Sequence, residues 1–141
     1  MNILVVENDP LHQKLAHYIL SSAGHTVSEA SGTEEALVSI KVKQPQMILL
    51  DLHMSGMPTL DFVRILKSDP YTQDIIIVAL TALPEYFTKK DFMSAGCEGY
   101  IRKPMDTRKL SAQLITIFDQ FSARLYKDIP VVGVARMWQK T

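Results

Sequence analysis

Four short, largely apolar runs recur along this chain, and each ends at a polar residue. Runs of this length, separated by segments with helical periodicity, are typical of buried strands in a parallel sheet. Ligands of such sheets bind outside the carboxyl ends of the strands. We therefore expect acids, a hydroxyl and an amine to meet in one crevice, and that set suits a divalent cation and a phosphoryl group. The runs are residues 3–6 before Glu7 and Asn8, 47–50 before Asp51, 75–80 before Thr81, and 100–102 before Lys103.

Strand and helix signals alternate regularly. Asp9 is the expected N-cap of the first helix, with Pro10 as the first residue of that helix. Gly24 is expected to end the helix at its C-terminus. Leu11, Leu15 and Tyr18, with Ile19, fall on one side of this helix, the side expected to pack on the sheet. We expect strands at 2–6, 26–30, 47–50, 75–80 and 99–102, and helices at 10–22, 33–43, 60–68 (capped by Thr59), 85–94 and from 106 or 107 to about 124.

Five β-α units in a row predict an α/β fold, a doubly wound, flavodoxin-like (βα)5 sandwich. Right-handed crossovers place helices on both faces of a five-stranded parallel sheet. The expected strand order is 2-1-3-4-5, whose switch point lies between the first and third strands. Glu7, Asn8 and Asp51 come from those two strands, so they are predicted to meet at that point.

Composition limits the classes of function. Lysine plus arginine equals aspartate plus glutamate at 15 each, so the basic field of a nucleic-acid binder is missing. No apolar run approaches the length of a membrane span, and the single cysteine, Cys97, cannot form an internal disulfide. A cytoplasmic protein with no nucleic-acid or membrane partner is the simplest interpretation. We expect one domain at 1–124 and a C-terminal tail at 125–141 whose role the sequence does not indicate.

Four segments together give the chain a resemblance to a known family. They read ILVVEND, MILLDLHM, IIIVALTA and GCEGYIRKPM. In this order, and at these strand ends, they resemble the response-regulator receiver domain of two-component signalling, of the short type without an output module. The resemblance covers about residues 1–122.

The resemblance implies a role for each residue of the set. Asp51 is the implied phosphoacceptor, and Mg²⁺ would be bound by Glu7, Asn8, Asp51 and the backbone carbonyl of His53. Lys103 would contact a phosphoryl oxygen, in front of a cis peptide bond to Pro104. Thr81 would donate its hydroxyl and Ala82 its backbone N–H to the phosphoryl group. Thr81 and Tyr100 would form the switch that reshapes the face of the fourth helix, fifth strand and fifth helix.

Asn8 departs from the family pattern, which usually has two acidic residues at the end of the first strand. An amide oxygen can coordinate Mg²⁺ but brings no charge. Losing one unit charge at contact distance costs up to about 4 kcal/mol in bare Coulomb energy at an effective dielectric near 20. We therefore predict weaker Mg²⁺ binding than in typical receivers.

The implied function is that of a phosphoacceptor receiver in a phosphorelay. Its partners would be a histidine kinase or phosphotransfer protein and a downstream protein target. The sequence leaves open whether the protein forms a homodimer. It would promote its own phosphorylation and dephosphorylation without being an enzyme with an output domain. One alternative is a phosphorylation-independent pseudo-receiver adaptor, which Asn8 favours. A second is a small phosphatase-type hydrolase, although the strand ends offer no separate acid or base for it.

Overall fold

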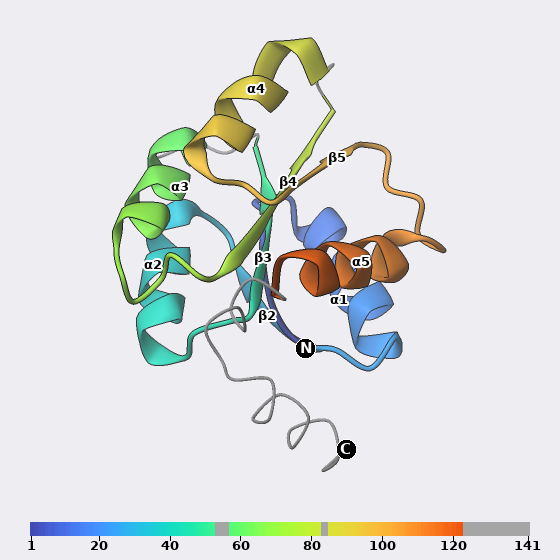
Figure 1. The fold of residues 1–141 in the computed structure, drawn as a ribbon. Coiled ribbons are helices and arrows are strands. Elements are labelled where there is room, and N and C mark those ends of the chain that lie inside the picture. The colour runs from blue at the N-terminus through green and yellow to red at the C-terminus, as the bar shows by residue number, and fades with distance from the viewer. Residues whose placement is uncertain (53–56, 83–84, 123–141) are drawn as a thin grey trace, which may run out of the picture.

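One parallel sheet of five strands forms the centre of the molecule (Figure 1). The computed structural model describes residues 1–52, 57–82 and 85–122, without the side chains of 85–88. The strand order is β2-β1-β3-β4-β5, which confirms the predicted fold class and order. His53 and the tail at 125–141 lie outside the described residues. The strands are β1 (Asn2–Val6), β2 (Thr26–Ala30), β3 (Met47–Asp51), β4 (Ile76–Thr81) and β5 (Gly99–Arg102).

Helices cover both faces of the sheet. In Figure 1, α1 and α5 lie on one side, and α2, α3 and α4 lie on the other. This division follows from right-handed crossovers between parallel strands. The helices are α1 (Pro10–Ser22), α2 (Thr33–Val42), α3 (Thr59–Ser68), α4 (Glu85–Ala95) and α5 (Leu110–Ser122).

Alternating residues of the buried strands build two separate cores. Leu4 and Leu50 face the core shared with α2, α3 and α4, whereas Ile3 and Leu49 face the core shared with α1 and α5. Every residue of β3 is buried. The sheet is therefore held rigid from both faces, and the side chains at its carboxyl edge are fixed in position.

The inward side of α1 differs from the prediction. Leu11 and Tyr18 are 73% and 72% exposed and Leu15 is also exposed, while Ala16 and Leu20 are buried against the sheet. Ile19 packs, partly buried, against the core as predicted. The prediction was wrong for Leu11, Leu15 and Tyr18, because both sides of this helix carry apolar residues at helical spacing. The small Ala16 lets the helix backbone approach the strands closely, and this favours the observed side.

Several element ends also differ by a few residues, as hydrogen-bond definitions commonly allow. Thr59 is the first residue of α3 rather than its cap, which is Pro58. The helix α5 begins at Leu110, later than predicted. Asp106 forms a turn before it, because its side chain accepts from the Arg108 N–H at 3.0 Å and its carbonyl accepts from the Leu110 N–H at 3.0 Å.

Candidate functional site

Four polar residues meet at the carboxyl edge of the sheet. Glu7 follows β1, Asp51 ends β3, Thr81 ends β4 and Lys103 follows β5. These strands are neighbours in the sheet, with β1 beside β3, β3 beside β4, and β4 beside β5. The topology therefore brings together residues as far as 96 positions apart in the chain.

Lys103 joins the two carboxylates. Its Nζ atom lies 2.8 Å from Oδ2 of Asp51 and 3.4 Å from Oε2 of Glu7. Both carboxylate side chains are almost fully buried, and the Lys103 side chain is mostly buried. Because the contact is shielded from water, its electrostatic strength exceeds that of a surface ion pair.

The beginning of α1 fixes Glu7. The Asp9 N–H donates to Oε1 of Glu7 at 3.1 Å, and Nε2 of Gln13 donates to the Glu7 carbonyl at 3.2 Å. Asp9 in turn caps the helix, because its side chain accepts from the Leu11 N–H at 2.9 Å. The capping role of Asp9 matches the prediction. No sequence pattern indicated Gln13, because its contact depends on the path of the chain between β1 and α1.

Backbone hydrogen bonds align the ends of β4 and β5. The Lys103 N–H donates to the Thr81 carbonyl at 2.7 Å. Thr81 is fully buried and the next residue, Ala82, is exposed. The peptide bond between Lys103 and Pro104 is cis. Tyr100 in β5 packs, partly buried, against the core under α2, α3 and α4.

Burial perturbs the ionisation of the site. Burial, together with the hydrogen bond to Asp51, raises the pKa of Glu7 to about 7, although the Asp9 N–H and Lys103 act in the opposite direction. Burial lowers the pKa of Lys103, but its hydrogen bond to Asp51 and the charges of Asp51 and Glu7 outweigh this, so the net pKa is raised. Both pKa shifts follow from burial and from the contacts of the two carboxylates with one lysine.

This deficit of positive charge fits a divalent cation. Within the described ranges, no three histidine, cysteine, aspartate or glutamate side chains form a candidate metal cluster. Mg²⁺, however, commonly uses one or two carboxylates and keeps several waters, and Glu7 and Asp51 supply that number. Asn8 is exposed next to Glu7, whereas the predicted fourth ligand, the His53 carbonyl, lies outside the described residues.

A pocket of about 310 Å³ lies beside Lys103. The pocket joins α1 to the segment after β5, and most of its lining is apolar. The exposed Leu11 and Tyr18 belong to the same helix, α1, whose residues form one wall of the pocket. Its lining residues are His12, Leu15, Ala82, Lys103, Pro104 and Met105.

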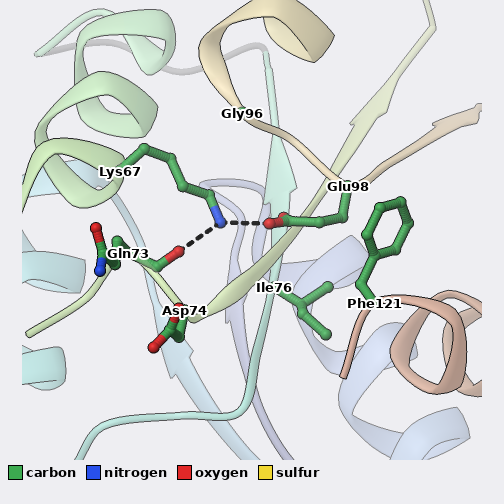
Figure 2. Close-up of a pocket in the computed structure, with 7 residues that line it drawn as sticks. All are labelled: Lys67, Gln73, Asp74, Ile76, Gly96, Glu98 and Phe121. Carbon is green, nitrogen blue, oxygen red and sulfur yellow. Dashed lines mark hydrogen bonds and ion pairs between the residues drawn. The ribbon is translucent and has the colours of Figure 1, made fainter. Parts of the chain in front are cut away.

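A second buried ion pair lies at the opposite edge of the sheet (Figure 2). Lys67 at the end of α3 pairs with Glu98, which precedes β5. Nζ of Lys67 also donates to the carbonyls of Gln73 and Ile75, at 3.0 and 2.7 Å, and Oε2 of Glu98 accepts from the Ile77 N–H at 2.7 Å. Because both side chains already bind the backbone around the start of β4, this pair has a structural role.

The sequence matches one protein family over most of its length. Residues 3–115 match the response regulator receiver domain. The phosphate regulon transcriptional regulatory protein PhoB of Pseudomonas aeruginosa is 35% identical over 112 residues, which are 79% of this chain and 49% of that protein. The two-component response regulator PhoP of the same organism is 32% identical over 92% of this chain and 56% of that protein. The chain thus spans about half the length of these relatives.

Solved structures agree with the fold. A putative response regulator from Chloroflexus aurantiacus has a TM-score of 0.79 and 25% identity, and covers 84% of this chain and 97% of that one. The receiver domain of the sensor histidine kinase PA1611 from P. aeruginosa, solved with magnesium coordinated in its active site cleft, has a TM-score of 0.76 and 24% identity over the same shares. Among the described residues, no helix is long and apolar enough to cross a bilayer.

Proposed function

The chain belongs to the response regulator receiver family, and we propose that Asp51 accepts a phosphoryl group from a histidine kinase or phosphotransfer protein in a phosphorelay. The contact that supports this most directly is the 2.8 Å ion pair between Nζ of Lys103 and Oδ2 of Asp51. It holds a cation where the oxygens of a phosphoryl group on Asp51 would lie. Charge on those oxygens is what a phosphoryl-transfer site has to stabilise.

The residues of the crevice have distinct roles in this proposal. An Asp51 oxygen attacks phosphorus, the new P–O bond forms as the bond to the donor breaks, and the product is an acyl phosphate. Lys103 remains as a point charge at the phosphoryl group. Thr81 and the Ala82 N–H lie at the end of β4, where they can donate to its other oxygens. Glu7, Asn8, Asp51 and the His53 carbonyl would hold Mg²⁺, which offsets negative charge during transfer.

The output in this proposal is a change of surface. Thr81 moves toward the phosphoryl group, and Tyr100 in the neighbouring strand rotates into the space it leaves. The two strands are directly paired, with Thr81 opposite Arg102 and Ala79 opposite Tyr100. A movement at the end of β4 can therefore pass to the face formed by α4, β5 and α5, where a downstream protein would bind.

The apolar surface of α1 supports a docking site for the phosphoryl donor. Leu11, Leu15 and Tyr18 are exposed on α1, and Leu15 also lines the pocket beside Lys103. A helix of the donor packed against these residues would approach the crevice that contains Asp51. Apolar side chains gathered beside a concave site are typical of such interfaces.

The test is intact mass spectrometry of the full chain after incubation with acetyl phosphate and Mg²⁺. We expect one added phosphoryl group, its loss in Asp51→Asn, and its retention in Asp61→Asn, a matched change at an exposed position of α3. An adduct that persists in Asp51→Asn would contradict the proposal.

The same experiment separates the pseudo-receiver alternative, which Asn8 favours. If the wild-type protein gains no phosphoryl group at high Mg²⁺ but Asn8→Asp does, then Asn8 has disabled the site. The chain would then act as a phosphorylation-independent adaptor. If both proteins gain the group, the adaptor alternative fails.

A further inference from the structure

A groove between α2 and α3 is unrelated to the Asp51 crevice. Its volume is about 630 Å³, and most of its lining is apolar. Two of its apolar residues are unusually accessible, with Tyr71 at 86% and Ile65 at 43% exposure. Single exposed apolar residues are normal, but two in one mostly apolar groove indicate a binding surface. Its walls include Leu37, Ile40 and Lys41 on one side and Ile65, Leu66 and Tyr71 on the other.

The end of α5 lies close to this groove. Ser122, the last described residue, lines a smaller hollow of about 230 Å³ together with Phe118, Gln44 and Pro45. Gln44 also lines the α2–α3 groove, and its side chain donates to the Tyr71 carbonyl. The chain after Ser122 therefore begins at a hollow that borders one end of the groove.

The chain beyond Ser122 has the composition that such a groove would accept. Residues 129–138 read IPVVGVARMW, with Arg136 as their only charged residue. Residues 123–141 contain four basic residues and one acidic residue, while the whole chain has zero net charge. The remainder of the chain is therefore negative, and Asp69 at the groove and Asp74 at the hollow are acidic.

The length of this segment is sufficient. Residues 123–128 can span about 20 Å when extended, which allows residue 129 to pass the hollow. The part of α2 that lines the groove, from Leu37 to Lys41, is about 6 Å long at the helical rise per residue. A ten-residue segment can thus cover the groove from end to end.

We propose that residues 129–138 dock in the α2–α3 groove of the same chain. The apolar residues of the segment cover Ile65 and Tyr71, and Arg136, its one charged residue, lies toward Asp69. A short tether gives an effective concentration in the millimolar range, so the segment of the same chain outcompetes that of a second copy. The docked segment leaves α4, β5 and α5 free, so this inference stands independently of the phosphorylation proposal.

Trp138 is the only tryptophan, so its fluorescence in the full chain reports on this segment. We expect Ile65→Glu in the groove to shift the emission to longer wavelength and to increase quenching by acrylamide. Val38→Glu is the matched control, because Val38 is an exposed apolar residue of α2 that is not among the groove's lining residues. Tyr71→Ser is a second groove variant. Because Tyr71 is highly exposed, we expect this substitution to leave the protein folded. Unchanged emission and quenching in both groove variants would overturn the proposal.

Cross-linking identifies the occupant. With cysteines introduced by Lys41→Cys and Val134→Cys in the full chain, mild oxidation should give a disulfide within one chain, independent of protein concentration. The native Cys97 is buried and does not compete. Disulfide-linked dimers whose yield rises with concentration would overturn docking within one chain and assign the groove to a second copy. The absence of any disulfide between these two positions would overturn the docking itself.

Discussion

Burial distinguishes the ionisable residues that matter in this molecule from those on its surface. Glu7 and Asp51 are almost fully buried, and each lies within 3.4 Å of Nζ of Lys103. An exposed pair such as Asp61 and Arg64, at 3.7 Å, contributes about 0–1 kcal/mol because water screens it. The same types of charge are therefore coupled in the crevice and nearly independent on the helix surface.

Burial also predicts the reactivity of Cys97. Burial first, and then the charge of Glu98, raises the pKa of the thiol to about 12, although Lys67 acts in the opposite direction. We expect alkylation by iodoacetamide at pH 8 to be slow in the native protein and fast in urea, measured by mass spectrometry. Ser94 is exposed near the end of α4, three residues before Cys97, so the variant Ser94→Cys is the control and should add one rapidly labelled site. Equal labelling rates for Cys97 and for residue 94 would contradict this.

The same shift has a consequence for stability at alkaline pH. The folded thiol keeps its proton, while the unfolded thiol loses it above its ordinary pKa of 9.0. The unfolded state therefore binds fewer protons above pH 9, and this group lowers the free energy of unfolding as the pH rises further. Cys97→Ala should weaken that decline in urea titrations above pH 9. An identical pH dependence in wild type and variant would be evidence against the shift.

At the scale of elements, the strands were the part of the fold that the sequence specified best. Apolar runs of four to six residues can be buried on both sides only as central strands, so their places and order could be predicted. The orientation of α1 could not be predicted, because Leu11, Leu15 and Tyr18 have the same helical spacing as a core-facing stripe.

In the site, the strand ends indicated Asp51, Thr81 and Lys103, whereas no sequence pattern indicated Gln13. The pair of Lys67 and Glu98 joins positions 31 residues apart, which no local pattern reveals.

This second ion pair is predicted to stabilise the connection from α3 to β4. Removing one partner leaves a buried charge and several backbone groups without their hydrogen bonds. Lys67→Met or Glu98→Gln should therefore each lower the free energy of unfolding by about 3–5 kcal/mol. Urea denaturation with circular dichroism measures this. Arg64→Met breaks an exposed pair on the same helix, and its cost should be at most about 1 kcal/mol. Similar losses for Lys67→Met and Arg64→Met would show that burial does not determine the strength of this pair.

At the scale of the whole molecule, the two edges of the sheet differ in how completely their charges are compensated. At the edge where β4 and β5 begin, one lysine meets one glutamate and the surrounding backbone. At the carboxyl edge, two buried carboxylates share Lys103, and the pKa of Glu7 is raised to about 7 by burial and by Asp51. The carboxyl edge thus has more buried acidic groups than cationic ones, and the free energy of unfolding should depend on what cation binds there.

Asn8→Asp tests this dependence, because its effect on global stability should change sign with Mg²⁺. Without divalent cation, the new carboxylate adds repulsion beside Glu7, and the free energy of unfolding should fall by about 1 kcal/mol. With Mg²⁺ at a hundred times its dissociation constant, binding adds about 2.7 kcal/mol, so the variant should become more stable than the wild type at the same concentration. Urea denaturation in EDTA measures the loss of stability without Mg²⁺, and urea denaturation at a series of Mg²⁺ concentrations measures the gain. Gln113→Glu adds the same charge at an exposed position of α5. Its free energy of unfolding, plotted against Mg²⁺ concentration, should not cross that of the wild type. If the curves of Asn8→Asp and the wild type do not cross, then Asn8 is not what limits Mg²⁺ binding, and the charge deficit at this edge must be met in another way.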